Sequence, residues 1–192
     1  MLISGPAGSG KTTLCDRLTA AFPQEIARAV TCTTRAPRGN EKDGVDYFFL
    51  SREAFEAGIA AGDFLEHAHV HSNLYGVRRA QVRERLEAGK NVIVNLDVQG
   101  AATLRKVAAG DASLRSALVS VFVMPPSVEE LRSRLTGRAT DAADEIERRM
   151  KVALEEMRRA EEFDFCLVSG DRESDFKRIC AIYEAAKMRV AR

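Results

Sequence analysis

Residues 5–12 read GPAGSGKT, and this stretch decides the fold of the chain. It matches the pattern G-x-x-x-x-G-K-[ST], in which glycines let successive backbone N–H groups point at phosphate oxygens. The apolar residues 2–4 precede it, and residues 14–22 follow with apolar side chains at helical spacing. A phosphate-binding loop needs this strand–loop–helix context, because the helix start adds partial positive charge. The stretch therefore predicts a site for ATP or GTP.

Each position of the loop has an expected part in binding the triphosphate. Lys11 would bridge the β- and γ-phosphates as a compact cation, and the hydroxyl of Thr12 would ligate Mg²⁺. The residues assigned to ATP are Gly5, Pro6, Ala7, Gly8, Ser9, Gly10, Lys11, Thr12 and Thr13. The pattern alone leaves open a small-molecule kinase, an ATPase, a GTPase or a nucleotide-sensing module, so the acceptor must be inferred from the rest of the chain.

Outside the loop, apolar runs alternate with amphipathic stretches. This order is typical of an α/β fold, in which helices cover both faces of a parallel sheet. Strands are expected at residues 2–4, 92–96, 118–124 and 165–168. Helices are expected after Ser51, after the capping box of Ser127 and Glu130, from residue 144 to residue 159, and near the C-terminus.

The chain has 192 residues, enough for one packed core with small insertions. We expect a single domain whose core comprises residues 1–29 and 78–192. Residues 30–77 interrupt the alternation with a segment rich in Thr, Arg, Gly and Asn, which indicates a small α+β insertion. A polar segment within residues 134–149 lies between two helical patterns, which indicates a short lid.

Bulk properties exclude several classes of protein. Lys and Arg number 29 and Asp and Glu number 28, a net charge of +1, so no overall field draws the chain to nucleic acid or to an anionic membrane. No apolar run approaches the ~18 residues of a membrane span, and the N-terminus lacks a signal-peptide pattern, so we expect a cytoplasmic protein. Four dispersed cysteines without a C-x-x-C pair are expected to be buried free thiols.

A second motif lies in the insertion, where residues 31–41 read TCTTRAPRGNE and residues 44–49 read GVDYFF. Arg35 and Arg38 bring two planar guanidinium groups beside a Pro/Gly turn, and each can hold a phosphate through two hydrogen bonds. The hydroxyl of Tyr47 can add another donor to the same anion. These side chains predict a clamp for a monophosphate, separate from the triphosphate site.

Together the two motifs resemble the guanylate kinases, a family of P-loop nucleoside monophosphate kinases. The family pattern is roughly S-x-T-T-R-x-x-R-x-G-E, a short spacer and G-x-D-Y-x-F, and the resemblance covers nearly the whole chain. It implies a P-loop NTPase-type sheet with a GMP-binding insertion and a lid. It also implies transfer of the γ-phosphate of ATP to GMP and to dGMP, with Mg²⁺ as cofactor and without a protein partner.

The resemblance assigns the acceptor site residue by residue. GMP contacts would come from Thr31, Arg35, Arg38, Tyr47, Glu66, Tyr75 and Asp97. Glu66 would accept hydrogen bonds from N1–H and from the 2-amino group of guanine. Adenine offers an acceptor at N1 and has no 2-amino group, so AMP would leave this carboxylate badly paired.

The resemblance also assigns the residues that act on the transferred phosphoryl group. The catalytic set is Lys11, Arg35, Asp97, Arg138 and Arg149. Arg138 and Arg149 would reach that group when the lid closes, because transfer requires cations that neutralise its spread charge. Asp97 follows an expected strand and would orient either GMP or a Mg²⁺-bound water, two roles that the sequence does not separate.

Four positions depart from the family pattern. Val77 stands where a serine or threonine contacts guanine, and losing that hydrogen bond would cost roughly 0.5–1.5 kcal/mol of GMP binding. Asn95 replaces an acidic residue, Ala139 replaces a lid glycine, and Ser169 replaces an asparagine near the adenine. These changes are expected to affect the catalytic efficiency and the selectivity for the nucleotide that donates the phosphoryl group.

Two other functions are open at this stage. A ribose 1,5-bisphosphate phosphokinase shares the fold but alters the guanine-reading positions, and Val77 fits such an alteration. A non-catalytic guanylate kinase-like binding module would have a degraded phosphate loop, whereas this loop is intact. Alternating His67, His69 and His71 are expected on the surface rather than at a metal, and the sequence does not separate a monomer from a homo-oligomer.

Overall fold

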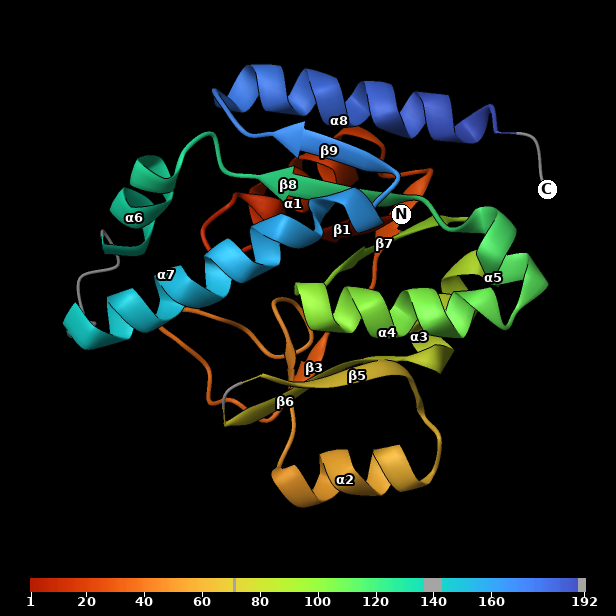
Figure 1. The fold of residues 1–192 in the computed structure, drawn as a ribbon. Helices are drawn as coiled ribbons and strands as arrows, with labels where there is room; N and C mark the ends of the chain where they lie inside the picture. The colour runs from red at the N-terminus through yellow and green to blue at the C-terminus, as the bar shows by residue number, and fades with distance from the viewer. Residues whose placement is uncertain (71, 137–142, 190–192) are drawn as a thin grey trace.

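The computed structural model describes residues 1–70, 72–136 and 143–189 and, within them, a central parallel sheet of five strands. In order across the sheet, the strands are β2 (Ile26–Arg28), β7 (Asn91–Asn95), β1 (Leu2–Ser4), β8 (Ser120–Met124) and β9 (Phe165–Val168). Each neighbouring pair is parallel. The α/β architecture expected from the sequence is confirmed (Figure 1), and the short edge strand β2 is an addition to the expected set.

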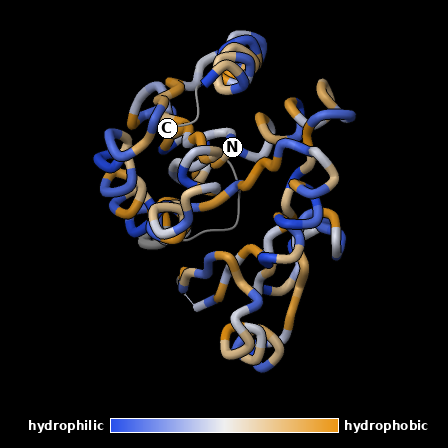
Figure 2. The backbone as a smooth tube through the Cα atoms, turned by 90° about the vertical axis from the view of Figure 1, so that its right-hand side faces the viewer, coloured by the Kyte–Doolittle hydropathy of each residue, from blue (hydrophilic) through white to orange (hydrophobic). Residues whose placement is uncertain are grey.

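Successive residues of the central strands β1 and β7 point to opposite faces of the sheet and enter two separate cores. Ile3 packs in the core on one face and Leu2 in the core on the other. The first face is covered by α1 (Lys11–Ala21) and α8 (Arg172–Lys187), and the second by α3 (Arg79–Glu87), α4 (Val98–Ala109) and α5 (Ala112–Ala117). Hydrophobic and hydrophilic segments alternate along the backbone, as the colours of the tube show (Figure 2).

Residues 32–78 form a second, smaller sheet with one helix beside it. Across this sheet the strands are β4 (Phe48–Phe49), β3 (Cys32–Thr33), β6 (Asn73–Arg78) and β5 (Phe64–Val70), and the helix is α2 (Arg52–Ala60). Ser51 caps α2, since its hydroxyl accepts a hydrogen bond from the Ala54 N–H at 3.1 Å. Phe55 stacks on Phe64 with ring centroids 4.3 Å apart, so this unit has an apolar core of its own.

The expected lid, residues 134–149, overlaps two helices, α6 (Val128–Thr136) and α7 (Ala143–Met157), and its residues 137–142 lie outside the described residues. The capping box that begins α6 is confirmed, because Ser127 Oγ accepts a hydrogen bond from the Glu130 N–H at 3.1 Å. A 3-10 turn, η1 (Arg158–Glu162), continues α7, so the α-helix ends slightly earlier than expected. Leu131 and Met150 belong to a small core between α6 and α7.

The cysteine prediction is correct for two thiols and wrong for another. Cys15 and Cys32 are buried and Cys180 is half-buried, whereas Cys166 is exposed because β9 is an edge strand with one open face. His67 and His69 are exposed on β5, and His71 lies outside the described residues. Within the part of the chain that the structure describes, each helix is too short or too polar to cross a membrane.

Candidate active site

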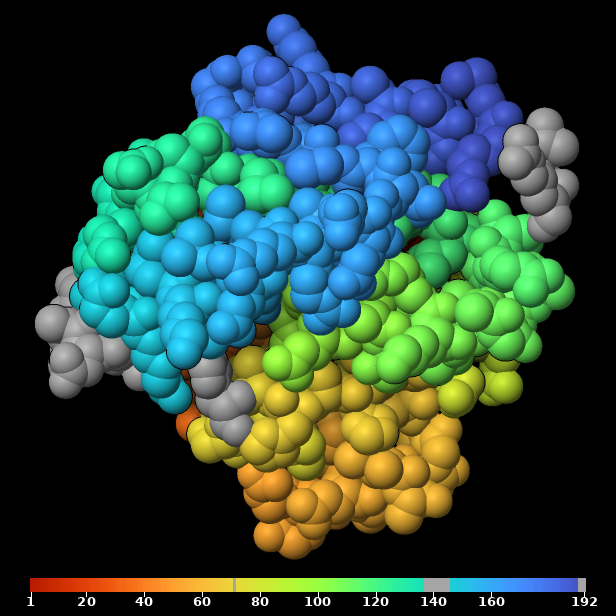
Figure 3. All heavy atoms as spheres, in the orientation of Figure 1, coloured from red at the N-terminus to blue at the C-terminus, as the bar shows by residue number. Residues whose placement is uncertain are grey.

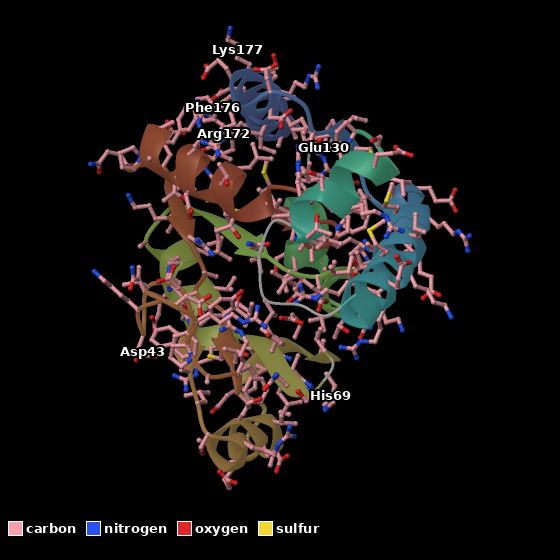
Figure 4. The ribbon with its side chains drawn as sticks, turned by 90° about the vertical axis from the view of Figure 1, so that its left-hand side faces the viewer. Asp43, His69, Glu130, Arg172, Phe176 and Lys177 are labelled. Atoms are coloured by element: carbon pink, nitrogen blue, oxygen red, sulfur yellow. The ribbon has the colours of Figure 1, made fainter. Side chains whose placement is uncertain are left out.

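A cavity of about 990 Å³ lies where the carboxyl ends of the central strands meet the smaller sheet. Open parallel sheets bind ligands at this edge, because the loops after the strands converge there. The cavity is lined by the phosphate loop, β5 and β6, the β7–α4 turn, α7 and the start of α8. The space-filling view shows α7 directly above the smaller sheet and against α4 (Figure 3). From another side, Arg172 on α8 and Glu130 on α6 lie in the upper half of the molecule, and Asp43 and His69 lie below them (Figure 4).

Most residues assigned from the sequence line this one cavity. They are Gly5, Ala7, Gly8, Ser9, Gly10, Lys11, Thr12, Thr13, Thr31, Arg38, Tyr47, Glu66, Tyr75, Asp97 and Arg149. Among the assigned residues that the structure describes, Pro6 and Arg35 are not part of the lining. Arg138 and Ala139 lie outside the described residues. The structure thus joins the phosphate loop and the insertion motif in a single site.

The phosphate loop is shaped by close backbone packing. Gly5 has a φ of 141°, and a Cβ there would lie 2.4 Å from Val123 O, so only glycine fits. Lys11 Nζ donates hydrogen bonds to the carbonyl oxygens of Gly5 and Pro6, both at 2.8 Å. Gly10, the N-cap of α1, has no side chain to bond the first N–H groups of that helix. These N–H groups can therefore bind phosphate oxygens.

Thr12, the expected metal ligand, lies beside the end of β7. Asn95 Nδ2 donates a hydrogen bond to Thr12 Oγ1 at 3.3 Å. An amide therefore stands where the resemblance leads us to expect an acid, and it orients the hydroxyl without adding negative charge. The hydroxyl oxygen has a second lone pair that a cation can use.

Glu66, on β5, is a buried carboxylate that lines the cavity. The residue is 2% exposed, and Oε1 has no hydrogen-bond partner among the described residues. Burial raises the pKa of Glu66 to about 8, and the negative charge of Asp97 adds to this effect. A Cβ on Gly100 would lie 2.9 Å from Glu66 Oε2, so the first turn of α4 packs closely on the carboxylate. A buried acceptor of this kind is stabilised by a ligand that donates hydrogen bonds.

Val77 lies directly opposite Glu66 in the pairing of β5 with β6. Opposed residues of an antiparallel pair project to the same face, with Cβ atoms about 4.5–5.5 Å apart. The Val77 side chain is fully buried in the core that also contains Leu65, and it does not line the cavity among the described residues. The Val77 side chain therefore packs beside Glu66 without offering it a hydrogen bond, whereas a backbone hydrogen bond from Val77 lowers the pKa of Glu66 against the effect of burial.

The expected phosphate clamp is only partly at the cavity surface. Tyr47 and Tyr75 line it with rings edge to face, 6.2 Å between centroids, and Arg38 lies beside them. Arg35 is 9% exposed and donates two hydrogen bonds to Glu41, at 2.8 and 3.0 Å. Glu41 also accepts a hydrogen bond from the Arg38 N–H at 2.7 Å. In this structure Arg35 therefore shapes the loop that carries Arg38.

Asp97 has a structural role that the sequence did not indicate. Its Oδ1 accepts a hydrogen bond from the Gly100 N–H at 2.7 Å, so Asp97 caps α4. The residue lines the cavity as well, with Thr31 from the smaller sheet and Arg149 from α7. The cap fixes the orientation of the carboxylate close to Glu66.

Sequence reasoning did not assign six charged residues that line the cavity: Arg17, Arg134, Glu156, Asp171, Arg172 and Asp175. Arg134 of α6 donates hydrogen bonds to Glu130 Oε1 at 2.9 Å and to Ser169 Oγ at 3.3 Å. Glu156 of α7 lies two helical turns after Arg149, on the same face. In the sequence, only the helical spacing from Arg149 could have indicated that Glu156 lines the site. Residues at helical spacing more often form the core of a protein than a binding site.

The sheet, with a phosphate loop after its middle strand and a second phosphate-binding motif on an inserted sheet, defines the class of P-loop nucleotide kinases. Within that class, the chain belongs to the guanylate kinase family, whose family model, described as Guanylate kinase, matches residues 1–186. The family expected from the sequence is thereby confirmed.

Individual relatives agree over most of their length. The guanylate kinase of Alkalilimnicola ehrlichii is 41% identical over 191 residues, which cover 100% of this chain and 90% of the relative. That of Rubrobacter xylanophilus is 45% identical over 173 residues, which cover 90% of this chain and 86% of the relative. The crystal structure of guanylate kinase from Anaplasma phagocytophilum, 33% identical, has a TM-score of 0.78 and covers 100% of this chain and 87% of that one.

Proposed function

We propose that this protein transfers the γ-phosphate of ATP to GMP, giving ADP and GDP. The observation that carries the proposal is Glu66, which has an oxygen unpartnered within the described residues and lines the same cavity as the phosphate loop. Guanine presents two adjacent donors, N1–H and the 2-amino group, and one carboxylate can accept both hydrogen bonds. Adenine lacks this pair of donors, so AMP would not stabilise the ionised form of the buried Glu66 carboxylate as guanine does.

The phosphate of GMP is expected at Arg38, Tyr47 and Tyr75. The guanidinium group can bind two phosphate oxygens, and the tyrosine hydroxyls add neutral donors. Arg35 would support this group through its bidentate pair with Glu41 and through its contacts with Tyr47 and Tyr75. We therefore assign Arg35 first to positioning the loop, and a direct contact with the phosphoryl group stays a prediction.

The triphosphate of ATP is expected at the phosphate loop. Lys11 would exchange its hydrogen bonds to the loop carbonyls for bonds to β- and γ-phosphate oxygens. Arg149, from α7, would neutralise charge on the transferred group, and Arg138 keeps its expected role in the lid. Holding two anions in line is most of what this reaction requires of a protein.

Mg²⁺ is the cofactor that we infer for the donor. Oxygen donors suit this hard cation, and the cavity lining offers the hydroxyl of Thr12 and the carboxylates of Asp97 and Glu156. Among the described residues, no three His, Cys, Asp or Glu side chains are grouped to hold a metal alone, so phosphates and water would complete the shell. When bound, Mg²⁺ would neutralise charge on the phosphate oxygens.

A coupled assay of ADP release with ATP and Mg²⁺ tests the proposal. The acceptors compared are GMP, dGMP, AMP, UMP, CMP and ribose 1,5-bisphosphate, and turnover confined to GMP and dGMP is expected. Turnover with ribose 1,5-bisphosphate alone would refute the proposal, and so would the absence of turnover with every acceptor. Because the proposed substrates are free nucleotides, we infer the cytoplasm as the location and small molecules, rather than nucleic acid, membrane or protein, as the partners.

A further inference from the structure

Glu156 places a carboxylate in a cavity that has to bind two phosphorylated anions. It lies on α7 and follows Arg149, Val152 and Ala153 along the helix face that lines the cavity. Burial raises the pKa of Glu156 to about 7, even though the nearby charge of Lys11 lowers it. A carboxylate at this position repels phosphate groups unless positive charge lies between them.

Three elements near Glu156 contribute charges. Lys11 comes from α1, Asp97 from the β7–α4 turn and Arg159 from η1. Arg159 already donates hydrogen bonds to Glu162 at 2.7 and 3.0 Å, and Lys11 donates to the loop carbonyls. Two carboxylates, Asp97 and Glu156, therefore lie close enough to interact in the cavity that contains the phosphate loop, and a cation bound there would be attracted to both.

The side chains around Thr12, the expected metal ligand, supply little negative charge for a cation. Thr12 is hydrogen-bonded to the neutral amide of Asn95, and Asp97 already caps α4. Mg²⁺ in nucleotide sites is held by one or two carboxylates together with phosphate oxygens and several waters. With an amide at Asn95, a second carboxylate for such a site would come from another element. Of the other carboxylates in the lining, Asp171 and Asp175 accept hydrogen bonds from backbone N–H groups around the start of α8. Glu156 of α7 instead interacts with Lys11 and Asp97.

We propose that Glu156 is a positioning residue for the Mg²⁺ complex of ATP, which its carboxylate holds through the water shell of the ion in place of an acid at Asn95. The inference rests on the proposed function, because it requires ATP at the phosphate loop. Without Mg²⁺, the carboxylate of Glu156 repels the triphosphate, and with Mg²⁺ it attracts the complex. Glu156 thus couples ATP affinity to the presence of the cation.

The test measures binding rather than turnover. Dissociation constants of a fluorescent ATP analogue are determined in EDTA and in excess Mg²⁺ for the wild type, for Glu156→Gln and for Glu155→Gln, the adjacent exposed position. Glu156→Gln should bind more tightly in EDTA and more weakly in Mg²⁺, which lowers the ratio of the two affinities by about tenfold. Glu155→Gln should keep the ratio of the wild type.

A second substitution keeps the test decisive if Glu156→Gln does not fold. Asn95→Asp supplies a carboxylate beside Thr12 and should raise the ratio in the wild-type background by about fivefold or more. If Glu156→Gln folds, adding Asn95→Asp to it should restore the wild-type ratio of the affinities in Mg²⁺ and in EDTA. Ratios unchanged by both substitutions, in a wild type that binds the analogue, would overturn the inference and leave the proposed function standing. A wild type that binds no analogue would overturn both.

Discussion

Replacing Glu66 by glutamine should stabilise the folded protein at pH 8 and remove its recognition of guanine. Glu66 is 2% exposed, and burial raises its pKa from 4.5 to about 8. The unfolded chain therefore releases this proton near pH 4.5, whereas the folded chain keeps it up to about pH 8. Between these values each pH unit removes about 1.36 kcal/mol from the free energy of unfolding, or roughly 4 kcal/mol by pH 8.

The direction of this effect follows from which state holds the proton. The stability that the neutral carboxyl of Glu66 allows is fully present below pH 4.5 and is lost as the pH rises through about 8. Glutamine has nearly the same shape and no proton to lose. Glu66→Gln should therefore differ from the wild type by about 1 kcal/mol or less at pH 5, and be more stable by roughly 4 kcal/mol at pH 8.

Urea unfolding of both proteins across this pH range measures the difference directly. Glu84→Gln, an exposed position on α3, is the matched control and should follow the wild type at every pH. In titrations with GMP, Glu66→Gln should bind roughly 100-fold more weakly, because two charge-assisted hydrogen bonds are lost. A stability difference that is the same at pH 5 and pH 8 would refute the reasoning, since the folded carboxyl would then titrate as it does in water.

Three further substitutions examine the acceptor half of the site. Gly100→Ala places a Cβ 2.9 Å from Glu66 Oε2 while favouring the helix, so we expect a folded variant whose KM for GMP rises about tenfold with KM for ATP unchanged. Equal changes in the two constants would contradict a local effect on Glu66. Arg35→Lys loses one arm of the pair with Glu41, and steady-state kinetics should show a roughly tenfold higher KM for GMP; an unchanged KM would mean that the pair does not shape the clamp. Val77→Thr puts a hydroxyl opposite Glu66, where donation to the carboxylate should lower its pKa and tighten GMP binding by roughly two- to tenfold. Calorimetry that finds no gain in GMP affinity would argue against a hydrogen bond from this position.

The donor half of the site and the fold class could be predicted because their signals are local. A phosphate loop is made of consecutive backbone groups, so the pattern at residues 5–12 is sufficient to identify it. Buried parallel strands such as β1 and β8 are short, largely apolar runs, which the sequence displays directly. The edge strand β2 and the exposure of Cys166 were not predicted. Whether a strand lies at the edge of a sheet, and whether its face is covered, depends on how other parts of the chain pack.

The sequence by itself determined that this chain carries a phosphate loop, an arginine-containing clamp and a glutamate suited to guanine. Only the tertiary structure decided how deeply each of these groups is buried and which side chains it contacts. Glu66 is desolvated because α4 packs on it, and Glu156 enters the site because α7 lines the cavity. Arg35 lies behind the lining residue Tyr47, where it pairs with Glu41. The physical reason is that charge state and reach depend on the burial and the neighbouring charges that long-range packing creates, and no local pattern contains them.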